Sequence, residues 1–174
     1  MNIVTSLDTL ENRAGMPAPA SALSVPAMPE PRMMARGGGS MITLRKSGAR
    51  PVSFSGRQLG AHNGYRLGTA LWHELNLYQT DDGRFVADIR VFTKAEGAKD
   101  QFHVFVADTL EDAISHFESY DPRADVVADF DLDDPEMTPA ELMVQAAALK
   151  YRVADAQSQY RALLGSFLSE LNGA

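Results

Sequence analysis

The strongest constraint on the fold is an alternation of apolar and polar residues on both sides of Asp81-Asp82-Gly83. A three-residue loop with glycine in its last position is typical of a β-hairpin. If Thr80 pairs with Arg84, Leu75 lies opposite Ile89 and one face of the hairpin is almost entirely apolar. A shift by one residue would place carboxylates on that face, so burial selects this register.

The second face of the same hairpin carries both aromatic and polar side chains. Its cross-strand pairs are Trp72 with Phe92, Glu74 with Arg90, Asn76 with Asp88 and Tyr78 with Val86. Trp, Tyr and Arg dominate binding hot spots at protein interfaces. Either a helix of the same domain covers this face, or a partner binds it. The candidate contact residues are Trp72, Tyr78, Arg90 and Phe92.

Shorter patterns predict the neighbouring elements. Alternating runs at 42–45, 52–55 and 102–106 favour strands. Gly56, Gly60 and Asn63-Gly64 are interpreted as turns. A capping box at Asp108 to Glu111 predicts a short helix that ends before Pro122.

Residues 124–133 alternate between apolar and mostly acidic side chains, which favours a further strand with an acidic outer row. Such a row could dock a basic protein partner or simply be solvated. Its candidate binding residues are Asp125, Asp129, Asp131 and Asp133.

A long helix is predicted over 138–172, because Thr138-Pro139-Ala140-Glu141 combines a capping box with proline in the first turn. Its apolar residues recur with 4-3 spacing, and they include Leu149 and Leu163. We expect this stripe to pack mainly within its own chain, and a homodimer through 138–172 stays open as a secondary use. The leucines at 164, 168 and 171 would widen the stripe for such a dimer.

The chain is therefore predicted to be α+β: an antiparallel β-meander of about four to six strands, one short helix and one long C-terminal helix. Residues 1–40 are rich in Pro, Ala and Gly and are predicted to be a disordered tail. Residues 41–174 are predicted to form a single domain.

The composition limits the kinds of site and the cellular compartment that we expect. There is no cysteine, which excludes disulfides and thiolate metal sites. We expect no signal peptide and no contact with a membrane, because no apolar run approaches the ~20 residues that span a bilayer. The simplest expectation is a cytoplasmic protein.

Motifs for catalysis are not evident, so an enzyme is not favoured. The four histidines lack ligand spacing, and no metal site or cofactor is predicted. The Asp129-x-Asp131-x-Asp133 run departs from a calcium loop at its glycine and final glutamate positions.

The hairpin with Asp82-Gly83-Arg84-Phe85, followed by Asp108 to Ala113, resembles the HicB-type antitoxins. That resemblance implies a three-strand meander followed by a helix. It covers only residues 70–118, and the inserted Lys94 to Lys99 departs from the family pattern. No membership is inferred from it.

The leading functional hypothesis is a non-enzymatic interaction or regulatory module that binds a protein, through the acidic row, the aromatic hairpin face or both. An alternative is association with nucleic acid, because the first 70 residues hold eight Lys/Arg against three Asp/Glu. A second alternative is an enzyme whose site assembles only in space. The nucleic-acid candidates within the basic segment 32–66 are Arg45, Lys46, Arg50, Arg57 and Arg66.

Overall fold

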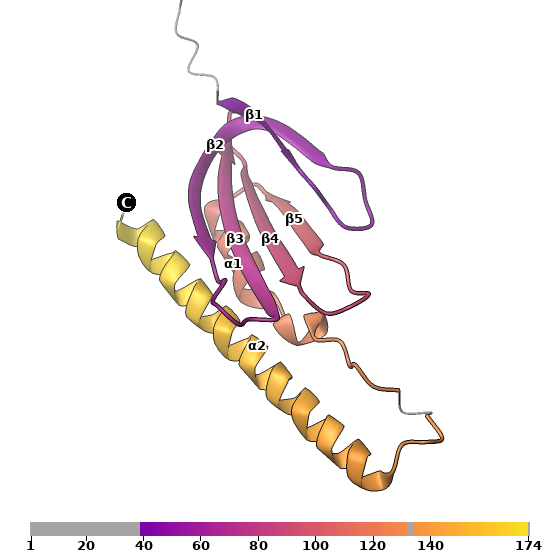
Figure 1. Cartoon of the computed structure of the whole chain (residues 1–174). Helices are drawn as coiled ribbons and strands as arrows, with labels where there is room; N and C mark the ends of the chain where they lie inside the picture. The colour runs from indigo at the N-terminus through magenta and orange to yellow at the C-terminus, as the bar shows by residue number, and fades with distance from the viewer. Residues whose placement is uncertain (1–38, 132–133, 174) are drawn as a thin grey trace, which may run out of the picture. The chain divides into compact units, whose positions relative to one another are not determined.

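The computed structural model describes residues 39–131 and 134–173, which all belong to one compact unit. The segment predicted to be a disordered tail lies outside these residues up to position 38, and so does Asp133. The elements follow one another as β1 (Ser40–Leu44), β2 (Val52–Asn63), β3 (Leu71–Thr80), β4 (Phe85–Thr93), β5 (Gln101–Ala107), α1 (Leu110–Ser119), the 3-10 helix η1 (Pro122–Asp125) and α2 (Pro139–Gly173) (Figure 1). The predicted α+β class, with an antiparallel meander, a short helix and a long C-terminal helix, is confirmed.

The five strands form one antiparallel sheet in the order of the chain. The predicted hairpin register is confirmed, since Leu75 pairs with Ile89 and Trp72 with Phe92. Gly83 has a φ of 90°, as its place in the three-residue loop requires. The Thr80 amide also donates to the Arg84 carbonyl at 2.9 Å, which closes the hairpin where the sequence predicts.

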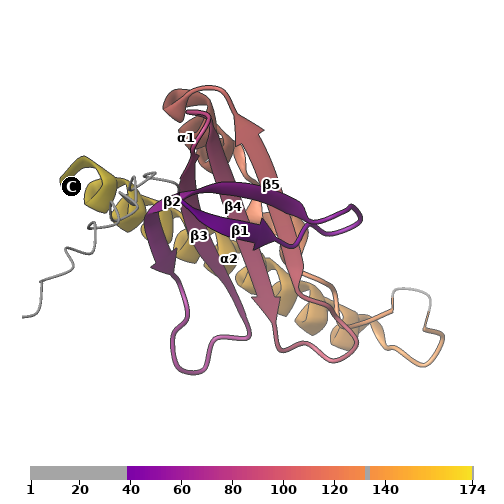
Figure 2. The same ribbon diagram turned by 90° about the horizontal axis from the view of Figure 1, so that it is seen from above.

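The sheet curls because β2 is long and bends over the hairpin, bringing β1 across it (Figure 2). The interpretation of Gly56 and Gly60 as turns is therefore wrong, since both lie inside β2. A Cβ at Gly56 would lie 2.2 Å from the Gln79 carbonyl oxygen, so this glycine allows a close approach of β2 to β3. The register shifts by one residue between Gln58 and Gly60, which is the signature of a β-bulge.

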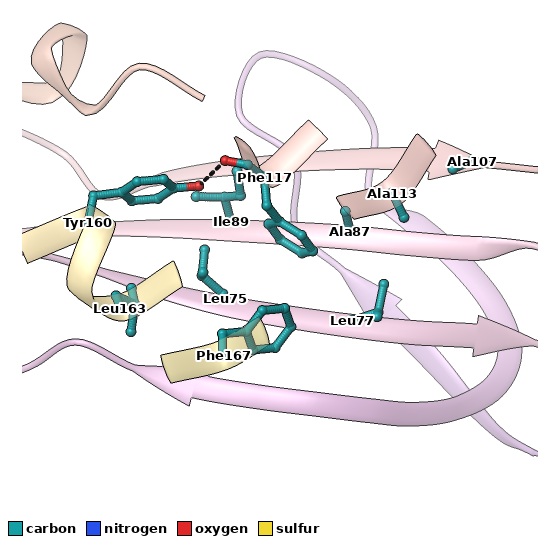
Figure 3. Packing of buried hydrophobic residues seen from close by; sticks show 10 residues of the cluster. All are labelled: Leu75, Leu77, Ala87, Ile89, Ala107, Ala113, Phe117, Tyr160, Leu163 and Phe167. Carbon is teal, nitrogen blue, oxygen red and sulfur yellow. Dashed lines mark hydrogen bonds between the residues drawn. The ribbon is translucent and has the colours of Figure 1, made fainter. Parts of the chain in front are cut away.

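The two helices cover one face of the sheet, called here the helical face (Figure 1). Figure 3 shows its core, in which Phe117 of α1 and Phe167 of α2 meet over Leu75 and Leu77. The Phe117 and Phe167 rings lie edge to face, with centroids 5.3 Å apart. The Tyr160 hydroxyl donates to the Phe117 carbonyl at 2.8 Å and ties the two helices together.

The opposite face of the sheet, called the inner face, is enclosed in part by the curl. A second, smaller core forms there, with Tyr78 and Val86 of the hairpin packed against Leu44 of β1 and Phe54 of β2. Neither helix covers this face, so strands β1 and β2 supply the cover that a helix could have given.

The predicted strand at 124–133 is wrong. Residues 122–125 form η1, and 126–131 have no regular structure. Alternation is a local signal, whereas a strand needs a free sheet edge to pair with. Here the Asp125 side chain bonds to His73 and Tyr120, which holds the segment on the helical side of the sheet.

The long helix α2 begins where the capping box predicts, because the Thr138 hydroxyl accepts from the Glu141 amide while the Glu141 carboxylate accepts from the Thr138 amide. α1 is capped by Thr109, one residue later than predicted. Only the second half of α2 is buried in the core, through Ala156, Tyr160, Leu163 and Phe167. Neither helix carries an apolar stretch of the length that a bilayer requires, as far as the described residues extend.

Candidate functional site

Four aromatic side chains gather at one end of the inner face and are called here the aromatic cluster: Tyr65, Trp72, Phe92 and Phe102. Trp72 and Phe92 are the predicted cross-strand pair, and their rings stack with centroids 5.3 Å apart. Tyr65, from the β2–β3 loop, meets Trp72 edge to face at 5.0 Å. Phe102 of β5 lies edge to face with Phe92 at 6.4 Å. Tyr65 is 45% exposed and the other three rings are half-buried, so the cluster reaches solvent.

Two cations lie over these rings. The Lys94 ammonium is 5.1 Å from the Tyr65 centroid and 5.7 Å from that of Trp72, and the Arg45 guanidinium is 5.9 Å from Phe102. A cation held over an aromatic face is attracted by the ring quadrupole. Neither cation forms an ion pair with any carboxylate in the described part of the chain.

Backbone contacts hold the β1–β2 loop beside this cluster. The Ser47 amide donates to the Phe102 carbonyl at 2.9 Å, and the Phe102 amide donates to the Ser47 hydroxyl at 2.9 Å. The curl thus brings the loop after β1 to the start of β5, at the far edge of the sheet. Of the basic residues in this loop, Arg45 lies over Phe102, whereas Lys46 is close enough to His116 of α1 to help lower the pKa of that imidazole.

A polar network separates the aromatic cluster from the second core. Asp88 is 1% exposed, and its Oδ2 accepts from Arg90 Nε at 2.8 Å. Arg90 also lies 3.6 Å from the Glu74 carboxylate, and Asn76 accepts a hydrogen bond from Gln58 at 3.0 Å. Burial raises the pKa of Asp88 above its ordinary value, against the lowering effect of the Arg90 guanidinium. Asp88 Oδ1 has no hydrogen-bond partner among the described residues.

The predicted aromatic surface is therefore divided by the fold. Trp72, Arg90 and Phe92 lie together, but Tyr78 is 6% exposed in the second core, edge to face with Phe54 at 5.7 Å. Burial raises the pKa of the Tyr78 hydroxyl. Tyr78 cannot touch a partner unless the curl opens.

The acidic residues predicted to form a row are separated as well. Asp125 is buried, whereas Asp129 is exposed and bonds to both terminal nitrogens of Arg152, at 2.6 and 2.9 Å. This ion pair lowers the pKa of Asp129. Asp131 is exposed, and Asp133 lies outside the described residues.

A second cluster lies on the helical face around the buried pair His73 and Asp125. His73 Nε2 is 2.8 Å from Asp125 Oδ2, and the Tyr120 hydroxyl donates to the same carboxylate at 2.8 Å. The Tyr120 and Tyr160 rings pack edge to face against the imidazole. Burial raises the pKa of both tyrosines well above the ordinary value. These contacts fix η1 to the sheet, and the imidazole is enclosed by rings.

The nucleic-acid candidates are also spread out. Arg45, Lys46 and Arg50 share the β1–β2 loop, and Arg66 lies in the β2–β3 loop. Arg57 bonds to Gln79, seven residues along β3 from Trp72, which corresponds to about 23 Å. Among the described residues, no three His, Asp or Glu side chains gather closely enough to hold a metal ion.

Sequence reasoning missed three members of this site: Tyr65, Lys94 and Phe102. Phe102 could have been found, because continuing the hairpin register into β5 places it opposite Arg90 on the inner face. Tyr65 and Lys94 lie in loops, where alternation gives no information on side-chain direction.

No protein-family model, no curated protein sequence and no solved structure matches this chain.

Proposed function

We propose that this domain is a non-enzymatic protein-interaction module and that it contacts its partner through the aromatic cluster. The observation that supports this most is the solvent-facing group of Tyr65, Trp72, Phe92 and Phe102, with Lys94 and Arg45 over the rings. Trp, Tyr and Arg are enriched among the residues that contribute most to binding energy at interfaces, and Phe is enriched at interfaces as well.

The chemistry of this surface favours an acidic partner segment. Lys94 and Arg45 carry full charges that no carboxylate of the described residues neutralises. Aspartate or glutamate side chains of a partner would supply the missing counter-charge and fix the orientation of the complex. The hypothesis of a basic partner receives less support, because Asp125 and Asp129 are already paired within the domain.

Nucleic acid remains the alternative, since Arg45, Lys46 and Arg50 share a loop beside Phe102. Binding of single strands relies on bases stacking on open aromatic faces. Here Phe92 stacks on Trp72, and Lys94 lies over the indole. A base would have to displace these contacts, so a protein segment that packs against the ring edges fits better.

The test starts with photo-crosslinking from position 65, which is 45% exposed within the cluster. The matched control places the same crosslinker at Met41, which is 73% exposed on β1. We expect position 65 to capture a protein that position 41 does not capture.

The affinity of that protein is then measured by calorimetry for Lys94→Glu and for Lys150→Glu, an exposed lysine on α2. We expect Lys94→Glu to weaken binding on the order of tenfold or more, and Lys150→Glu to leave it unchanged. Equal effects of the two substitutions would reject the cluster as the contact surface. Salt-sensitive capture of single-stranded RNA or DNA at position 65, with no protein, would favour the alternative.

A further inference from the structure

A cavity of about 430 Å³ is lined in part by residues 66–70 of the β2–β3 loop. Four segments form its walls: residues 66–71, Thr93 and Ala95 at the end of β4, residues 125–127 at the end of η1, and residues 152–159 of α2. Cavities of roughly 300–1,000 Å³ accommodate small molecules in proteins. The aromatic cluster contributes none of its residues to this cavity, so it is a separate site.

Most of the lining is apolar, with Leu71, Val126, Val127 and Ala156 among its members. Leu67 stands at the rim and is 97% exposed. Leu67 lies in a hydrogen-bonded turn, in which the Thr69 amide donates to the Arg66 carbonyl at 3.0 Å and Gly68 has a φ of 86°. A leucine fixed in water beside an apolar cavity gains burial when an apolar molecule occupies that cavity.

Two arginines of the lining carry hydrogen-bond donors or charge that no group of the described residues satisfies. Arg152 uses its two terminal nitrogens on Asp129, but its buried Nε has no partner among the described residues. Arg66 forms no ion pair in the described part of the chain.

The carboxylates of the lining are largely engaged. Asp125 accepts from Tyr120 and bonds to His73, and Asp155 accepts from Gln159 at 2.6 Å. A buried donor without an acceptor is costly, so a ligand that brings an acceptor is favoured over one that brings a further donor.

We propose that this cavity binds a small, mainly apolar carboxylate. The hydrocarbon part occupies the space between Leu71, Val127 and Ala156 and comes under Leu67. The carboxylate accepts from the Arg66 guanidinium, whose planar donors match its two oxygens, and from the unpartnered Nε of Arg152.

The test titrates the full-length protein, with labelled leucine and valine methyl groups, against hexanoate, hexanol and hexylammonium in separate NMR experiments. We expect saturable shifts at the Leu67 and Val127 methyl groups, with hexanoate binding at least tenfold more tightly than hexanol or hexylammonium. Hydrogen bonds to charged groups correspond to roughly a 10- to 100-fold change in affinity.

Two variants and two matched controls locate the site. Arg66→Gln should weaken hexanoate on the order of tenfold and leave hexanol unchanged. Val127→Trp should block both ligands, since Val127 is 61% exposed and a larger ring fits there without disturbing the core. Arg57→Gln and Val144→Trp, at another exposed arginine and a 67% exposed valine, should change neither affinity.

Three results would overturn the proposal. Hexanoate could bind no more tightly than the alcohol or the ammonium compound. Its shifts could map away from Leu67 and Val127, or no saturable shift could appear at millimolar ligand while the wild-type spectrum shows a folded protein.

Discussion

Asp88 is the most constrained charged residue of the inner face. It is 1% exposed, its Oδ2 bonds to Arg90, and its Oδ1 has no partner among the described residues. The groups that face it are Arg90, Glu74 and Asn76, and burial raises its pKa in spite of Arg90. The folded protein therefore favours the protonated form of Asp88 more than the unfolded chain does.

The sign of the resulting pH dependence follows from proton linkage. With a raised folded pKa, the contribution of Asp88 to stability is full below its ordinary pKa of 3.8 and is lost as pH rises through the folded pKa. Wild-type stability relative to Asp88→Asn should thus be greatest at low pH and fall as pH rises. Urea unfolding of both proteins on both sides of pH 3.8 measures this difference, and a constant or rising difference would contradict the prediction.

At the scale of the elements, the two halves of α2 differ in burial. Leu163 is 6% exposed in the core, whereas Leu149 is half-buried and the nearby Met143 and Tyr151 are 74% and 73% exposed. Figure 1 shows the first half of α2 extending past the sheet. The candidate dimer residues Leu164, Leu168 and Leu171 pack against the core of the same chain.

We therefore predict that Leu163→Ala lowers the free energy of unfolding by ~2–5 kcal/mol, because it leaves a cavity in the core. Leu149→Ala, its control on the same helix, should cost clearly less. Chemical denaturation at several protein concentrations makes the measurement. A midpoint that rises with protein concentration would show that α2 is a dimer seam instead.

Two glycines test how closely the elements approach one another. A Cβ at Gly56 would lie 2.2 Å from a β3 carbonyl oxygen, whereas one at Gly165 of α2 has nothing within 4 Å. We predict that Gly56→Ala destabilises the domain by about 1–3 kcal/mol through forced backbone movement. Gly165→Ala should stabilise it by about 1 kcal/mol, because alanine is the better helix former. Thermal unfolding of both variants decides, and a neutral Gly56→Ala would mean that β2 and β3 are less tightly packed there.

For the whole molecule, the features that could be predicted from the sequence are those that depend on residues close together in the chain. The register of Leu75 with Ile89 follows from Gly83 and binary alternation, and the start of α2 follows from Thr138 and Glu141. The curl could not be predicted in this way, because it brings Leu44 and Phe54 onto Tyr78, which lies far along the chain.

The candidate site was predictable only in part, for the same physical reason. Trp72, Arg90 and Phe92 share a face in any correctly paired hairpin, and the structure keeps them together. Tyr78 shares that face too, but β1 and β2 fold over it. Asp125 fits an alternating strand in sequence, yet its hydrogen bonds to His73 and Tyr120 determine its conformation.

If a protein partner covers the aromatic cluster, the chain carries a spectroscopic probe for that contact. Trp72 is the only tryptophan in the sequence, and its indole is half-buried between Phe92, Tyr65 and Lys94. The direct measurement is the Trp72 emission spectrum during titration with the partner captured from position 65, using a tryptophan-free form of that partner. We expect a saturable blue shift, because binding removes the indole from water, and we expect Lys94→Glu to move the midpoint to higher concentration. Binding detected by calorimetry with an unchanged Trp72 spectrum would show that the partner docks elsewhere on the domain.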